Sequence, residues 1–179
     1  MKILETQRLA LRTLAPEDLG DLYALYRDPE IRRYFPEGTL TYEQTREELA
    51  WFLQGGDPAH PELGLWATVH KDTGRFIGRC GLIPWTIDGK EEVEVAYLLA
   101  KDYWRQGLGA EIAEALVRYG FERLHLSRLI ALIDPENGAS IGTAEKAGLR
   151  FERRIEHEGS PCLLYAIKSR DLREPSPDS

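Results

Sequence analysis

The sequence contains few cysteines, and their spacing is not that of a metal site. Cys80 and Cys162 are the two cysteines among 179 residues, and neither belongs to a CxxC pair. No cysteine or histidine stands at zinc-finger spacing. We therefore expect two buried thiols in a reducing compartment, in preference to a disulfide, a metal site or a cysteine nucleophile.

Positive charge and long apolar runs are also scarce. The formal net charge is −7, which disfavours a nucleic-acid partner because phosphate binding needs a basic face. No stretch approaches the roughly 20 apolar residues that span a bilayer. The N-terminal residues 1–14 lack the continuous apolar core of a signal peptide. We expect a cytoplasmic protein without a membrane or nucleic-acid partner.

Hydrophobic periodicity along the chain predicts a mixed α/β fold. Alternating or short apolar stretches indicate seven strands, and spacings of three and four indicate helices between them. Short turns join the three strands in the middle of the chain, which predicts an antiparallel meander. The expected strands are 7–13, 63–70, 75–83, 91–99, 128–133, 149–155 and 163–168. The expected helices are 16–26, 42–54, 108–124 and 138–147.

No linker or repeat divides this pattern into separate units. The expected fold is therefore a single domain over residues 1–173, with helices on both faces of one mixed, mostly antiparallel sheet. Residues 174–179 (EPSPDS) carry no apolar residue and are expected to form a disordered tail.

Two glycines open the helix expected after the meander, in the stretch WRQGLGAE. Gly107 and Gly109 allow the chain to approach an anion at a helix N-terminus, where backbone N–H groups lack partners. A tight turn without a ligand explains the glycines equally well. The stretch is not a P-loop, because Ala110 and Glu111 replace the required Lys-Ser/Thr. It also lacks the third glycine of a dinucleotide-binding fold.

Several stretches in order resemble the GNAT acetyltransferases, and the resemblance covers about residues 6–173. WRQGLG at 104–109 matches the family's Gln/Arg-x-x-Gly-x-Gly/Ala pyrophosphate loop except at Trp104. Tryptophan at that position resembles the RimJ/RimL-like branch of the family. The other matching stretches are TQRLALR (6–12), DPEI (28–31), GRFIG (74–78), NGAS (137–140) and EKAGL (145–149).

The resemblance implies acetyl-CoA as cosubstrate, no metal, and a sheet that is splayed at the acetyl-CoA site. It places the pantetheine arm against the backbone of the strand at 91–99, and it assigns Asn137 and Ser140 to the cofactor as well. A helix-capping role for Asn137 is compatible with this contact, whereas an ordinary serine in the first turn of a helix is an equally good reading of Ser140. The implied cofactor contacts are Leu98, Leu99, Arg105, Gln106, Gly107, Leu108, Gly109, Ala110, Asn137 and Ser140.

Three side chains are candidates for catalysis. Glu94 is the first choice for the base, although a solvated or ion-paired strand glutamate is an equally good reading of its position. Glu152 resembles a carboxylate of ribosomal-protein acetyltransferases, and Ser140 matches the serine expected to donate to the leaving thiolate. Tyr97 and Tyr165 are weaker candidates. Trp51, Trp66 and Trp85 are candidates for lining the acceptor site, with a core position as the alternative.

The implied reaction is direct acetyl transfer to a primary amine through a ternary complex. The acceptor is the α-amine of a protein N-terminus or a small-molecule amine, and no covalent enzyme intermediate is needed. The alternative is a CoA-binding sensor without turnover. Family members are often homodimers, so a homodimer is possible here as well.

Overall fold

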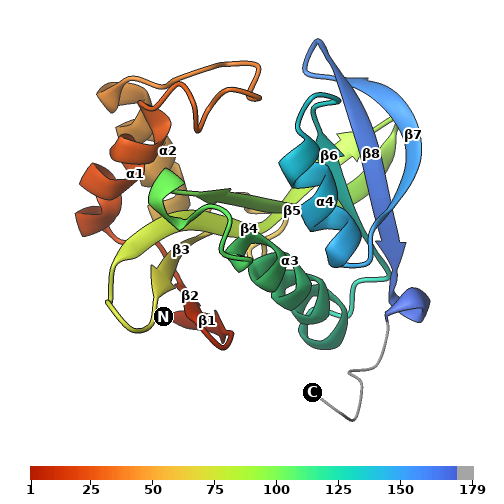
Figure 1. Ribbon diagram of the computed structural model, residues 1–179, viewed down its shortest axis with the longest axis horizontal. Coiled ribbons are helices and arrows are strands. Elements are labelled where there is room, and N and C mark those ends of the chain that lie inside the picture. Colours follow the sequence, from red (N-terminus) through yellow and green to blue (C-terminus); the bar gives the residue numbers. More distant parts are fainter. Residues whose placement is uncertain (173–179) are drawn as a thin grey trace.

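An eight-stranded sheet runs through the computed structural model, which describes residues 1–172 (Figure 1). Its strand order is β1-β2-β3-β4-β5-β6-β8-β7, and all neighbours are antiparallel except β5 and β6. The strands are β1 (Lys2–Glu5), β2 (Leu9–Arg12), β3 (Gly64–His70), β4 (Phe76–Ile87), β5 (Lys90–Leu99), β6 (Arg128–Ile133), β7 (Arg150–His157) and β8 (Ser160–Lys168). The mixed, mostly antiparallel sheet confirms the predicted fold class. The short edge strand β1 is the addition to the seven expected strands, and the predicted tail 174–179 lies outside the described residues.

The sheet opens between β5 and β6. These strands are parallel and share one register pair, Glu94 with Ile130. Beyond Glu94 the two strands diverge, whereas β5 keeps a continuous register with β4 from Lys90 to Leu99. The predicted splay of the sheet therefore lies at the carboxyl-terminal half of β5.

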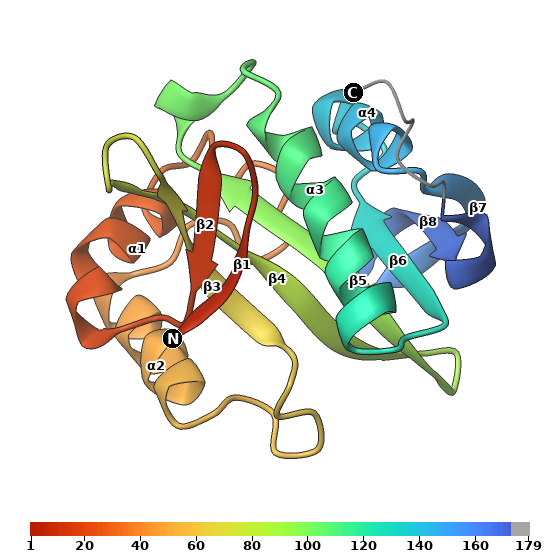
Figure 2. The ribbon, with the colours of Figure 1, turned by 90° about the horizontal axis from the view of Figure 1, so that it is seen from below.

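Four helices cover the two faces of the sheet in pairs (Figure 2). Side chains of β5 that pack with α3 and α4 include Val95 and Leu99, and we call this side of the sheet the α3 face. Leu98 packs with α1 and α2 on the opposite side, which we call the α1 face. The helices are α1 (Leu19–Tyr26), α2 (Tyr42–Leu53), α3 (Leu108–Arg118) and α4 (Gly138–Lys146).

The β4–β5 hairpin is longer than the sequence predicts. Its turn places Asp88 at φ 50° and Gly89 at φ 75°, the left-handed geometry that a two-residue hairpin requires. Pro84 does not end β4, because β3 begins opposite Leu82 and no strand on that side needs an N–H from Pro84. The hairpin thus carries Trp85 and Glu94 past the edge of β3.

Candidate active site

The N-terminus of α3 has no side-chain cap. Gly107 caps this helix with φ 77° and has no side chain to accept from the first-turn N–H groups. The other two long helices with sequence-predicted caps differ: Thr41 accepts from Gln44 at 3.1 Å, and Asn137 accepts from Ser140 N–H at 3.2 Å. The first turn of α3 therefore presents backbone donors and the positive helix end to an outside anion.

The N-terminal segment holds this loop in place. Glu111 accepts hydrogen bonds from Thr6 Oγ1 at 2.6 Å, from the Arg8 N–H at 2.9 Å and from Arg8 Nε at 2.7 Å. Arg8 Nη1 also donates to the Gln106 carbonyl at 2.8 Å. Burial opposes ionisation of Glu111, but the bonds from Thr6 and Arg8 outweigh it and lower the pKa of its carboxyl. This clamp gives the matched residues Thr6 and Arg8 a physical role that sequence reasoning missed.

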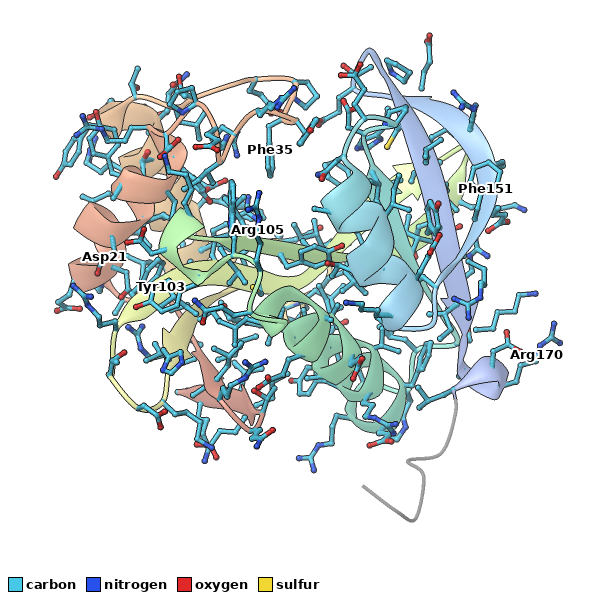
Figure 3. All side chains as sticks on the ribbon, viewed as in Figure 1. Asp21, Phe35, Tyr103, Arg105, Phe151 and Arg170 are labelled. Carbon is cyan, nitrogen blue, oxygen red and sulfur yellow. The ribbon has the colours of Figure 1, made fainter. Side chains whose placement is uncertain are left out.

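The loop is also tied to the end of β5. Trp104 Nε1 donates to the Leu99 carbonyl at 2.8 Å, so the departure from the family motif at this position forms a structural bond. Arg105 follows with φ 62° and an exposed side chain, and Figure 3 shows it near the N-terminus of α3. The positive φ values of Arg105 and Gly107 turn the chain sharply into the helix.

The backbone of β5 alternates in the direction of its polar groups. Ala100 N–H donates to the Ile77 carbonyl at 2.7 Å, and a Cβ at Gly78 would lie 2.2 Å from the Leu98 carbonyl oxygen. Leu98 therefore bonds toward β4, while Tyr97 and Leu99 direct their backbone groups toward the opening. This corrects the prediction that Leu98 offers its backbone groups at the opening. The alternation of side chains along a strand does not show toward which neighbouring strand a residue directs its N–H and C=O groups.

A tyrosine and a serine meet across the opening on the α3 face. Tyr97 Oη lies 2.9 Å from Ser140 Oγ and 3.1 Å from the Ser140 carbonyl oxygen. Burial raises the pKa of Tyr97 to about 12, so its hydroxyl keeps its proton at neutral pH. The pair joins β5 to the first turn of α4. Tyr97 is thus a stronger site candidate than its sequence position indicates.

A glutamate with a raised pKa lies on the α1 face of β5. Glu94 Oε2 accepts from Trp85 Nε1 at 2.6 Å. Solvent still reaches part of this residue, but burial of its carboxyl raises the pKa to about 7 against the opposing Trp85 bond and Arg79 charge. Trp85 in turn packs edge-on against His157 of β7, with ring centroids 4.5 Å apart. A carboxyl with this pKa suits proton transfer near neutral pH.

Glu152 lies in a different environment. It pairs with Arg128 at 2.7 Å, and the same guanidinium bonds to Glu92 at 3.0 Å. Arg128 lies two residues before Ile130, on the side of the β5–β6 contact away from the opening. These three charged residues line a cavity of about 850 Å³ that does not include Glu94, Tyr97 or Ser140. The structure therefore brings Glu152 to an ion-pair network and not to the opening.

The remaining candidates divide between the core and the surface. Trp66 packs against Tyr119, and Tyr165 packs against Phe151, which places Trp66 and Tyr165 in the core on the α3 face. Trp51 is about half exposed on α2, at 48%. Among the three tryptophans considered for the acceptor site, Trp85 is the one that contacts a candidate catalytic group, Glu94. Cys80 and Cys162 are both free thiols, and Cys80 is buried as predicted, whereas Cys162 is only partly buried.

Within residues 1–172, no group of three His, Cys, Asp or Glu side chains is placed to hold a metal ion. None of the helices in that range combines the length and the apolarity needed to cross a bilayer.

Comparisons with known proteins match the whole of this architecture. The chain is 35% identical to the uncharacterized Bacillus subtilis protein YkkB over 93% of this chain and 95% of YkkB. It is 31% identical to the uncharacterized N-acetyltransferase p20 of Bacillus licheniformis over 79% and 78% of the two chains. A GNAT-family acetyltransferase structure from Bacillus anthracis superposes with a TM-score of 0.78 at 25% identity, covering 95% and 99%.

A more distant likeness and a family model complete the comparison. The structure of AAC(6')-Ib in complex with paromomycin and acetyl-CoA shares the fold, with a TM-score of 0.77 at 18% identity over 97% and 100% of the chains. The model for the acetyltransferase (GNAT) domain matches residues 8–150. The match spans Arg8 and Glu111 of the clamp, the opening of the sheet and the glycine loop. The chain therefore belongs to the GNAT family of N-acetyltransferases.

Proposed function

We propose that this chain transfers an acetyl group from acetyl-CoA directly to a primary amine within a ternary complex. The observation that carries the proposal is the opening between β5 and β6. A hydroxyl pair, Tyr97 and Ser140, lies on one face, and a carboxyl with a pKa of about 7, Glu94, lies on the other. A donor and a base on opposite faces suit a reaction in which sulfur leaves on one side and an amine arrives on the other.

The glycine loop fits the pyrophosphate of acetyl-CoA. The N–H groups after Gly107 lack a side-chain cap, and the left-handed φ of Gly107 keeps the approach open. We assign Arg105, Gln106, Gly107, Leu108, Gly109 and Ala110 to the pyrophosphate, and Tyr97, Leu99, Asn137 and Ser140 to the pantetheine arm. AAC(6')-Ib, which has the same fold, was solved with acetyl-CoA, and this supports the choice of cosubstrate.

The two faces act on different groups of the reactants. When the amine nitrogen bonds to the thioester carbonyl carbon, Glu94 accepts the proton that the nitrogen loses. When the carbon–sulfur bond breaks, the sulfur leaves as a thiolate that is stabilised by a hydrogen bond from the hydroxyl pair of Tyr97 and Ser140, and Glu94 releases its proton to solvent. The indole of Trp85 orients the Glu94 carboxyl. Ion pairing with Arg128 keeps Glu152 out of this step.

The acceptor is an α-amine of a protein N-terminus or the amine of a small molecule. The motifs at Thr6–Arg12 and Trp104 favour the RimJ/RimL-like branch of the family, and we place residues 1–173 in a single catalytic domain. A sensor that binds CoA without turnover is the competing function, and it predicts an opening without a competent base. The position of Glu94 at the β5–β6 contact, where Trp85 Nε1 holds its carboxyl, supports turnover instead.

Thiol release from acetyl-CoA over a panel of primary amines tests the proposal. We expect acceptor-dependent release in the wild type, a large loss in Glu94→Gln, and smaller losses in Ser140→Ala and Tyr97→Phe. Calorimetry with CoA runs in parallel for every variant. CoA binding without acceptor-dependent release from any amine, a protein N-terminal peptide included, would reject the transferase and establish the sensor.

A further inference from the structure

Two buried arginines lie close together on the α1 side of the sheet. Arg79 of β4 is 5% exposed, and Arg32, between α1 and α2, is 4% exposed. Both guanidinium groups stack on the rings of Tyr26 and Phe35, at 4.0 to 5.6 Å from the ring centroids. Figure 3 shows Phe35 near the centre of the molecule, between the α1–α2 pair and α4 in that view. Burying two like charges together is costly unless each finds partners.

Arg79 has few partners of its own. Within residues 1–172 its one hydrogen bond runs from Nε to Tyr26 Oη at 2.9 Å, although a guanidinium carries five N–H donors. Glu48 of α2 supplies opposite charge nearby, but its buried Oε2 makes no hydrogen bond within the described residues. Arg32, in contrast, donates to the Gly38 carbonyl at 2.8 Å and pairs with Glu37 at 3.6 Å. The four terminal N–H donors of Arg79 are therefore left for a ligand or for water.

The position of Arg79 relates it to the candidate base. Arg79 pairs with Leu98, and Glu94 pairs with Ile83, so both side chains stand on the α1 face about four residues apart along the β4–β5 ladder. The pair between them consists of Gly81 and Ala96, which add little side-chain bulk to that face. The Arg79 charge reaches the Glu94 carboxyl, where it opposes the rise in pKa that burial causes. On the α1 face, two small residues thus lie between the carboxyl of Glu94 and the guanidinium of Arg79.

We propose that Arg79 binds a carboxylate carried by the acceptor, so that the substrates are amines bearing an anionic group. The inference rests on the proposed acetyl transfer, and it names the acceptor class of that same site. A planar guanidinium with free terminal donors pairs with a carboxylate through two parallel hydrogen bonds. The carboxylate end then lies beside Arg79, and the amine reaches over Gly81 and Ala96 to Glu94. Stacking on Tyr26 and Phe35 fixes the guanidinium plane before the acceptor arrives.

The first experiment compares matched acceptors. Straight-chain amino acids from glycine through 6-aminohexanoate are each assayed beside their own carboxamides, with acetyl-CoA saturating. We expect at least one carboxylate to exceed its amide tenfold or more in kcat/KM, and Arg79→Gln to remove that preference. Arg33→Gln is the control, because Arg33 is an exposed arginine next to Arg32 in the segment between α1 and α2, and it stacks on Tyr34 alone among the described rings. This control should keep the wild-type preference.

A second experiment measures binding without turnover. Calorimetry follows N-acetylated 6-aminohexanoate and its amide binding to the CoA-loaded protein, for wild type and Arg79→Gln. If the carboxylate binds more tightly than the amide and Arg79→Gln abolishes this difference, the inference is supported. This holds even if no amine is acetylated, because the absence of acetylation would reject only the proposed function. The inference would be overturned if the wild type used and bound carboxylates and amides equally. It would also be overturned if Arg79→Gln kept a native melting curve and still preferred the carboxylate.

Discussion

The two faces of β5 carry groups of different kinds. On the α3 face, the groups that we assign to acetyl-CoA are neutral: backbone N–H donors after Gly107, and the Tyr97–Ser140 hydroxyl pair. On the α1 face, the groups are ionisable and largely removed from water, with Glu94 and Arg79 four residues apart along the ladder. One strand therefore lies between a set of fixed dipoles and two ionisable groups, a buried guanidinium and a partly exposed carboxyl.

The difference shows how each face controls its chemistry. Backbone donors at a helix end stay in place whatever the pH, so the α3 face is set by geometry and by the clamp at Glu111. Buried side chains change charge with their surroundings, so the α1 face is set by desolvation and by neighbouring charges. Substitutions should therefore separate the faces: geometric changes should alter CoA affinity, and charge changes should alter rate and its pH dependence.

The largest effect is expected from Gly107→Val, which disturbs the α3 face alone. Gly107 holds φ 77°, a backbone conformation that a β-branched residue cannot adopt without strain. We expect a loss of CoA affinity of about 100-fold or more, because two charge-assisted hydrogen bonds of roughly 1.5–3 kcal/mol each are displaced. Calorimetry with CoA measures the affinity directly.

Two controls accompany this variant. Gly107→Ala should lose less affinity, because a Cβ there would lie no closer than 3.5 Å to Arg8 Nη2 and the cost is that of the backbone angle. Circular dichroism should show a native fold for both variants. A CoA affinity unchanged in Gly107→Val would remove the loop from the binding site.

Glu94→Gln disturbs the α1 face and should slow the reaction about 100-fold, within the range typical of general-base catalysis. The wild-type kcat/KM should rise with pH through about 7, because the base is active only after its carboxyl ionises. The glutamine variant should lose this rise and keep its CoA affinity. A pH profile of thiol release, recorded for both proteins, tests the assignment.

Stability provides an independent readout for Glu94. Its folded-state pKa lies above the value of an unfolded chain, so folding favours the protonated form. The stability that this group contributes is present below its unfolded pKa and falls as pH rises toward about 7. Glu94→Gln should therefore melt no lower than the wild type at pH 8. If Glu94→Gln melts at a lower temperature than the wild type and loses activity only in proportion to the folded protein lost, the role of Glu94 is structural.

Periodicity and turn residues are local properties, and they predicted the order of elements. The opening of the sheet was implied by the resemblance to the GNAT acetyltransferases. The choice of Glu94 as the base stays a prediction, and its bond from Trp85 forms within a single hairpin. The sequence did not predict contacts between distant segments. Thr6 contacts Glu111, 105 residues away, and Tyr97 contacts Ser140, 43 residues away. The error at Leu98 has another cause, since side-chain alternation gives the face of a residue but not the edge toward which its backbone bonds.

A smaller effect is expected from Glu111→Gln, which loosens the α3 face without touching the loop itself. The substitution removes the charge that holds Arg8 at 2.7 Å, and Arg8 in turn holds the Gln106 carbonyl. We expect KM for acetyl-CoA to rise about tenfold with kcat nearly unchanged, since a charge-assisted bond of this kind contributes roughly 1.5–3 kcal/mol. Glu114→Gln, exposed on the same helix, is the control. A fall in kcat with KM constant would contradict a positioning role.

The smallest effect is expected from Glu152→Gln, which tests whether the ion pairs of Arg128 take part in the reaction. Glu94 and Glu152 are both strand glutamates, but the carboxyl of Glu94 is desolvated, whereas Glu152 is 41% exposed and paired with Arg128. An exposed ion pair contributes roughly 0–1 kcal/mol, so stability should change little. We expect kcat/KM within about twofold of the wild type and an unchanged pH profile, because Arg128 keeps Glu92 as its partner. A rate loss comparable to that of Glu94→Gln would show that both carboxylates act on the same proton, and that the ion-pair network belongs to the reaction and not only to the fold.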